Sequence, residues 1–151
     1  MIEELNKSFK RISRKLFSRS LNYYADFKLY QCEGMAGESL NTVATAALGD
    51  RARVGGSGLA TKEEVIEDLR SALHFEGDDG AHPNIDYLKK PENQKDFEAV
   101  ISLVHAILDD SGLIVRFWLE DGHRFYPVFW DFAFLIETAE DSILFIASSS
   151  D

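Results

Sequence analysis

The sequence predicts an α+β fold in which N-terminal helices pack on a C-terminal four-stranded antiparallel meander. Apolar residues recur at steps of three and four through much of residues 1–112, as on the buried face of a helix. Over residues 113–148 the pattern changes to short apolar runs separated by turn residues. The chain of 151 residues has the usual length of one domain, so we expect residues 1–151 to share a single core.

The first predicted element is an amphipathic helix within residues 1–20. Basic residues surround an apolar stripe made of Ile2, Leu5, Phe9, Ile12 and Leu16. Such a helix either packs on the protein's own core or meets a membrane or an acidic partner. We favour packing, because the stripe has no tryptophan and the rest of the chain is acidic.

The next segments are less regular. Residues 21–34 fit either a short strand or a continued helix, and residues 38–48 predict a helix that ends before Gly49. Residues 49–60 contain Gly55, Gly56 and Gly58, so we expect a loop or hinge there. The spacing of these glycines fits neither a P-loop nor a dinucleotide-binding turn.

Two longer helices follow. Thr61 and Glu64 form a capping box at the start of a helix that we expect to end near Phe75. A polar loop comes next, and Pro91 marks the start of a second helix with a broad apolar stripe, which ends at Asp109–Gly112.

The predicted strands are 113–119, 124–130, 132–136 and 142–147. Asp121-Gly122 is a strong hairpin signal between the first two strands. Pro127 cannot donate to a strand ladder, so we expect it at an edge or a bulge. The last two strands are apolar on both faces, which favours helices on both sides of the sheet over burial against a partner.

Charge excludes some classes of function. The net charge is −10, but residues 1–20 have six basic and two acidic side chains, a net of +4 that leaves −14 for the rest. An acidic surface repels nucleic acid and anionic lipid. We also expect no membrane span, no signal peptide and, with Cys32 as the single cysteine, no internal disulfide. These features favour a cytoplasmic protein.

We expect no catalytic centre, no cofactor and no metal site. The four histidines are scattered without ligand spacing, and neither Cys32 nor Ser57 lies in a nucleophile motif. The acidic residues instead gather in clusters, several of them in predicted loops, where they can attract a basic protein. The predicted partner-binding residues are Glu76, Asp78, Asp79, Asp109, Asp110, Glu120 and Asp121.

The size, the charge and the run from Trp130-Asp131-Phe132 to Ile146 and the serine-rich end resemble the small acidic immunity proteins of bacterial contact-dependent and polymorphic toxin systems. The resemblance implies a cytoplasmic, non-catalytic antidote that binds and blocks a toxin, often a basic nuclease. Two alternatives remain open. One is a small enzyme or ligand-binding protein with Gly55–Gly58 as a lid, and the other is a homodimeric structural subunit.

Overall fold

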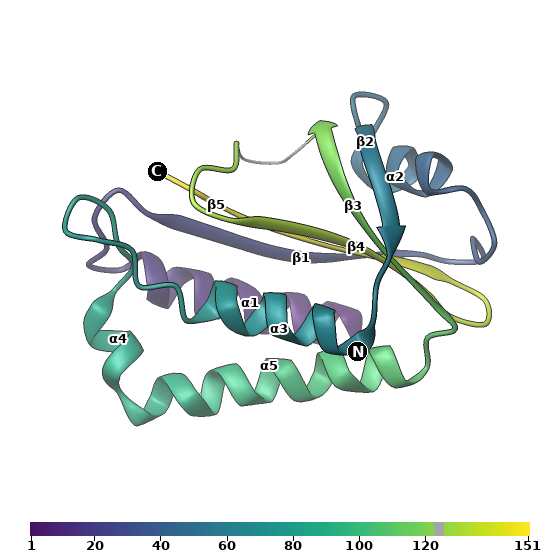
Figure 1. The fold of residues 1–151 in the computed structure, drawn as a ribbon. Coiled ribbons are helices and arrows are strands. Elements are labelled where there is room, and N and C mark those ends of the chain that lie inside the picture. Colours follow the sequence, from purple (N-terminus) through teal and green to yellow (C-terminus); the bar gives the residue numbers. More distant parts are fainter. Residues whose placement is uncertain (123–125) are drawn as a thin grey trace.

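The computed structural model describes residues 1–122 and 126–151. Within them, five strands form one antiparallel sheet in the order β1-β5-β4-β3-β2 (Figure 1). The strands are β1 (Tyr24–Cys32), β2 (Arg53–Leu59), β3 (Leu113–Asp121), β4 (Asp131–Glu137) and β5 (Ser142–Ser150). The α+β class is confirmed, but the sheet is not a four-stranded C-terminal unit. β1 comes from residues 21–34, where the sequence fits either a strand or a helix, and β2 comes from the predicted loop of residues 49–60.

Helices cover both faces of this sheet. On one face lie α1 (Ile2–Phe17), α3 (Lys62–Leu73), the short α4 (Ile85–Lys89) and α5 (Pro91–Asp109), and on the other lies α2 (Leu40–Leu48) (Figure 1). The predicted amphipathic helix, the capping box and the proline start are confirmed: Thr61 accepts a hydrogen bond from the Glu64 amide, and Pro91 stands in the first turn of α5. No described helix is long and apolar enough to cross a membrane.

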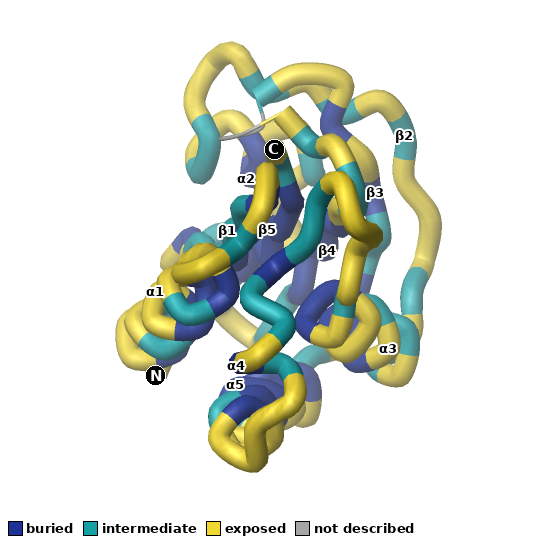
Figure 2. Tube along the Cα trace, turned by 90° about the vertical axis from the view of Figure 1, so that its left-hand side faces the viewer, coloured by how far each residue is buried: buried dark blue, intermediate teal, exposed yellow. Residues whose placement is uncertain are grey.

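The sheet separates two cores, which Figure 2 shows as buried backbone on both sides of the central strands. In the larger core, Phe9 of α1 stacks on Phe27 of β1 with ring centroids 5.2 Å apart and contacts Phe145 of β5 at 5.6 Å. In the smaller core, Val43 of α2 is fully buried beside β3, β4 and β5. The prediction of helices on both faces is therefore confirmed.

Two predicted segments are wrong. Residues 53–59 form the edge strand β2 rather than a loop. The extended backbone of Gly55 and Gly56, which have no side chains, leaves room for the indole of Trp118 on β3. Tyr126–Trp130 does not form a strand, and the start of that predicted strand lies outside the described residues. Pro127 has no amide hydrogen, and the segment instead bonds to the end of β5 through Ser149, which accepts from the amides of Phe129 and Trp130.

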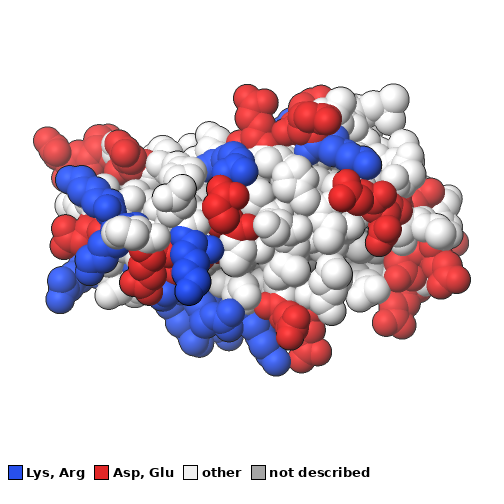
Figure 3. Space-filling model, turned by 90° about the horizontal axis from the view of Figure 1, so that it is seen from below, with Lys and Arg blue, Asp and Glu red and all other residues white. Residues whose placement is uncertain are grey.

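Charges are divided over the helical layer. Figure 3 shows that Lys and Arg side chains gather on one long side of this layer, whereas Asp and Glu side chains lie mostly on the others. The basic side chains of α1 explain this pattern, since α1 lies at the β1 side of the layer. The expected docking of a basic helix beside an acidic body is confirmed.

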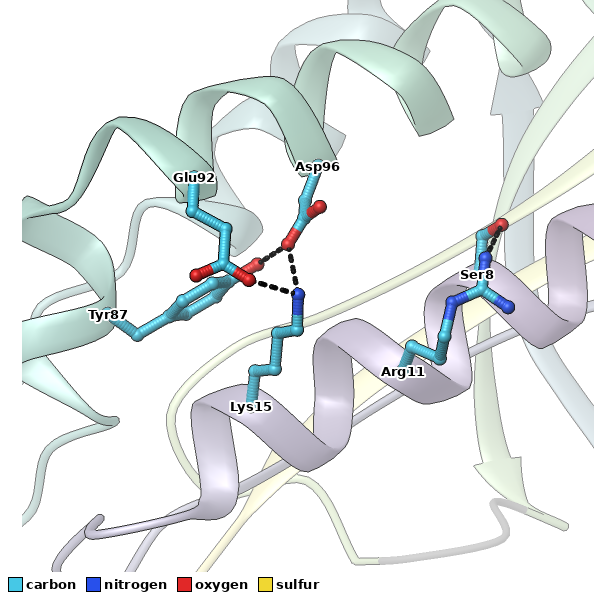
Figure 4. A network of polar contacts seen from close by, with 6 residues as sticks. All are labelled: Ser8, Arg11, Lys15, Tyr87, Glu92 and Asp96. Carbon is cyan, nitrogen blue, oxygen red and sulfur yellow. Dashed lines mark hydrogen bonds and ion pairs between the residues drawn. The ribbon is translucent and has the colours of Figure 1, made fainter.

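A polar network ties α1 to α4 and α5 (Figure 4). The Lys15 amine lies 2.7 Å from Glu92 Oε1 and 2.8 Å from Asp96 Oδ2, and the Tyr87 hydroxyl donates to the same Asp96 oxygen at 2.6 Å. Partial burial raises the pKa of Asp96, but the hydrogen bonds from Lys15 and Tyr87 lower it by more. The hydrogen bond to Asp96 likewise raises the pKa of Lys15. The network stabilises the ionised carboxylate and fixes α1 in place.

Candidate functional site

The seven acidic residues predicted to bind a partner are all exposed, but the fold does not bring them together. Glu76, Asp78 and Asp79 lie in the loop after α3, and Asp109 and Asp110 lie at the end of α5, at opposite ends of the molecule (Figure 1). Glu120 and Asp121 lie at the end of β3 that points away from α5 (Figure 1). The single predicted surface is thus three separate ones.

Two of these surfaces have local explanations. Asp78 Oδ1 accepts hydrogen bonds from the amides of Gly80 and Ala81 at 2.8 and 3.0 Å, so this carboxylate holds its own turn. Asp109 lies 3.8 Å from the amine of Lys62, the first residue of α3. Asp78 and Asp109 thus have partners within the chain itself.

The end of β3 has a different setting, because β3 leaves its neighbour there. β3 pairs with β4 only from Leu113 to Arg116, but it pairs with β2 as far as Asp121. Between the diverging strands lies a cleft of about 370 Å³. The residues that line it include the acids Glu120, Asp121 and Asp131 and the aromatic residue Tyr126. Tyr126 is 84 % exposed.

Trp118 lies beside this cleft, on the face of the sheet that carries α1, α3 and α5. Its register partner on β2 is Gly56, and the indole rests on the backbone of Gly55 and Gly56. A Cβ atom at Gly55 would lie 2.7 Å from Trp118 Cδ1 and 2.8 Å from Glu120 Cγ, and a Cβ at Gly56 would overlap the six-membered ring. Only glycine at positions 55 and 56 leaves room for the indole to lie against the β2 backbone, and we call this contact the indole seat. Trp118 is 55 % exposed in this position.

Glu120 joins the two features. Its side chain lines the cleft and also lies next to the indole over Gly55. None of the ion pairs among the described residues includes Glu120 or Asp121, although Arg53 is the register partner of Asp121. An exposed indole beside carboxylates suits a guanidinium or ammonium group, which the ring face attracts and the carboxylates pair with.

A neighbouring cation is already neutralised. The Arg116 guanidinium bonds to Asp68 Oδ2 at 2.5 Å and Glu64 Oε2 at 3.2 Å, and lies 4.8 Å from the ring centroid of Phe134. The hydrogen bond from Arg116 is the main reason that the pKa of Glu64 is lowered. Arg116 therefore does not compete for Glu120.

Other chemical groups show no comparable arrangement. Cys32 lies in the smaller core, and burial raises the pKa of its thiol. Over the residues that the structure describes, no three His, Cys, Asp or Glu side chains lie close enough to hold a metal ion. A hollow of about 490 Å³ lies between α1 and β1, at the opposite edge of the sheet from Gly55–Gly58, so that segment cannot act as its lid.

Comparison of the chain with models of protein families, with curated proteins and with solved structures found no match in any of the three. The resemblance to immunity proteins therefore stays a prediction.

Sequence reasoning identified the two acids of this site but missed its aromatic centre. Trp118 falls within the predicted strand 113–119 and received no role of its own, and the glycines were predicted to lie in a loop. A signal was present: an aromatic residue on one strand often covers glycines on the neighbouring edge strand. The pairing of Gly55-Gly56 with Trp118 follows from that rule once β2 is recognised as a strand.

Proposed function

We propose that this protein is a non-catalytic binding protein that recognises a basic protein partner through the end of the β2–β3 pair. The observation behind the proposal is that Trp118 is held half exposed on two glycines next to Glu120, and that neither Glu120 nor the following Asp121, which accepts a hydrogen bond from the Gly122 amide, belongs to a described ion pair. An indole fixed in this way loses little side-chain freedom on binding, and tryptophan is enriched among the residues that dominate binding energy.

The overall charge supports the same kind of partner. A net charge of −10 attracts a basic protein over a distance of about 10 Å at ordinary salt and speeds its approach. The fast association should therefore slow as salt rises, while the contact at Trp118 should be less sensitive to salt.

The biological role we propose is that of a cytoplasmic antidote, as in bacterial toxin–immunity pairs. In this role the protein would cover a basic toxin, such as a nuclease, and prevent its action. The proposal rests on the sequence resemblance together with the acidic site, and it requires no catalytic group in this chain.

The test begins with affinity capture from native cells, using wild-type protein and two double variants. Glu120→Lys with Asp121→Lys reverses two charges at the site. Glu76→Lys with Asp79→Lys makes the same charge change in the loop after α3, where neither residue forms one of the described ion pairs. We expect one basic protein in stoichiometric amount with wild type and the loop variant, and its loss with the β3 variant.

The captured protein is then expressed in a sensitive host with each variant. Growth inhibition that wild type and the loop variant relieve, and that the β3 variant does not, supports the antidote. If both double variants bind equally, the site is wrong; if no basic protein is retained, or the retained protein is harmless, the proposed function is wrong.

A further inference from the structure

β2 forms one outer edge of the sheet, and its far side has no neighbouring strand in the described chain. Figure 2 shows most of β2 as exposed backbone at one side of the molecule. β2 is also the least buried strand, and Leu59 at its end is 80 % exposed. The strand thus presents its backbone directly to solvent.

The direction of its backbone groups follows from the ladder with β3. Ala60 donates its amide to the Ile114 carbonyl at 3.0 Å, so Ala60 faces β3. Because successive residues of a strand face opposite sides, Gly58 also faces β3, whereas Ser57 and Leu59 face outward. Among residues 1–122 and 126–151, β2 pairs with β3 alone, so the outward amides and carbonyls of Ser57 and Leu59 have no strand beside them.

This edge lacks the usual protections against strand addition. Natural edges are commonly blocked by proline, by lysine or by a covering element. Residues 53–59 contain neither proline nor lysine, and Arg53 at the start of the strand is its one charged residue. The Trp118 indole lies over Gly55 and Gly56, but nothing lies within 4 Å of the Cβ position of Gly58, so the second half of the strand is unobstructed on that face. The register shifts near Val54 affect only the start of the strand.

The surroundings of the edge are acidic. Glu63 and Glu67 are exposed on α3, which begins three residues after β2 ends, and none of the described ion pairs includes them. Glu120 lies over Gly55 at the other end of the strand. A segment that pairs with β2 would therefore meet carboxylates near both ends. The nearby basic residues are Arg53, whose register partner is Asp121, and Lys62, which lies 3.8 Å from Asp109.

We propose that the outer side of β2 binds an extended basic segment of the partner protein, which adds to the sheet as a further strand beside Ser57–Leu59. Main-chain hydrogen bonds supply affinity in this mode, and the flanking acids select lysine or arginine. A second copy of this chain is disfavoured as the occupant, because pairing two β2 edges would bring like charges together. The inference rests on the proposed function and specifies its binding geometry.

The probe is the peptide acetyl-Thr-Arg-Val-Arg-Val-Arg-Thr-amide, with a matched peptide in which glutamate replaces each arginine. Amide exchange of ¹⁵N-labelled protein is followed by NMR with and without peptide. We expect the basic peptide to slow exchange at Ser57 and Leu59 and to shift the Trp118 indole resonance. The acidic peptide should do neither.

Ser57→Pro provides the matched variant, with Ser57→Ala as its control. Because the Ser57 amide faces outward, proline removes no hydrogen bond to β3 and the fold should be retained. Proline removes one donor to the added strand and obstructs its approach, so we expect peptide affinity to fall at least about tenfold, with no change for alanine.

Two results would overturn the proposal: slowed exchange at Ser57 and Leu59 that depends only on protein concentration, which indicates self-pairing, or equal peptide binding by Ser57→Pro and wild type. The captured partner separates the two levels of inference. If it still binds Ser57→Pro but not Glu120→Lys with Asp121→Lys, strand addition is wrong and the acidic site stands.

Discussion

The two edge strands of the sheet differ in how their outward backbone groups are covered. At the β1 edge, Asn6 of α1 donates to the Leu29 carbonyl and accepts from the Leu29 amide, both at 2.8 Å, so one side chain takes the place of a neighbouring strand. Ala25, whose backbone faces the same way, is fully buried. Within the described residues the β2 edge has no such cover, and the indole of Trp118 lies over its glycines.

The comparison indicates that an edge strand of this sheet is covered from solvent where a helix packs against it. α1 covers β1 because the side chains of β1 on that face belong to the larger core, where Phe27 meets Phe9. β2 contributes glycines on the same face and so gives a helix nothing to bury against. The open edge is therefore a direct result of the glycine-rich sequence.

The largest expected effect is a difference between the two edge strands in how much their side chains contribute to the free energy of unfolding. Phe27→Ala should reduce the free energy of unfolding by about 3–5 kcal/mol, because it leaves a cavity in the larger core. Leu59→Ala, at an 80 % exposed position of β2, should stay within about 0.5 kcal/mol. Urea denaturation measures both. Similar losses at the two positions would show that β2 is anchored as firmly as β1.

A smaller effect tests the indole seat on β2. Gly56→Ala should cost about 1–3 kcal/mol, because the new methyl group overlaps the ring of Trp118. Gly58→Ala is the matched control, since nothing lies within 4 Å of its Cβ position. Combining Gly56→Ala with Trp118→Ala should remove most of the cost. If the cost persists without the indole, the glycine serves some other purpose than the seat.

Asn6 tests the closure of the β1 edge. Asn6→Ala should cost about 1 kcal/mol, because the Leu29 amide and carbonyl lose their partner. Exchange of the Leu29 amide should accelerate by more than that of its neighbours. Asn6→Asp keeps the acceptor but not the donor, so its cost should be intermediate. An unchanged Leu29 amide in Asn6→Ala would mean that α1 closes the edge without this side chain.

The smallest effect concerns acid and the attachment of α1. The pKa of Asp96 lies below its ordinary value of 3.8, so the folded state binds this proton less readily than the unfolded state does. Its contribution, at most about 1 kcal/mol, is present above pH 4 and is lost as the pH falls through the folded pKa. The Asp96→Asn variant should lack this part of the acid dependence in urea titrations. If the free energy of unfolding varies with pH in the same way for both proteins, Asp96 does not contribute to the acid dependence.

Sequence patterns predicted α1, α2, α3 and α5, because each has an apolar stripe or a clear cap, as at Thr61 and Pro91. They missed α4, because five residues are too few to show a helical period. They predicted β3, β4 and β5 because short apolar runs ended at turn residues. They failed for β2, since the energy that makes this segment a strand comes from its ladder with β3 and from Trp118, both distant in sequence. For the same reason two acids of the site were predicted, but their neighbours were not.

The position of β5 between β1 and β4 has a consequence for the order of folding during synthesis. Ser142 of β5 donates its hydroxyl to the Met35 carbonyl, across 107 residues of chain. β5 pairs with β1 along its whole length and with β4 from Ser142 to Ser148. β1 and β2 leave the ribosome early, yet neither can pair until the strands of the last third have followed. We therefore expect slow, late closure of the sheet, with apolar strands exposed meanwhile and dependent on chaperones.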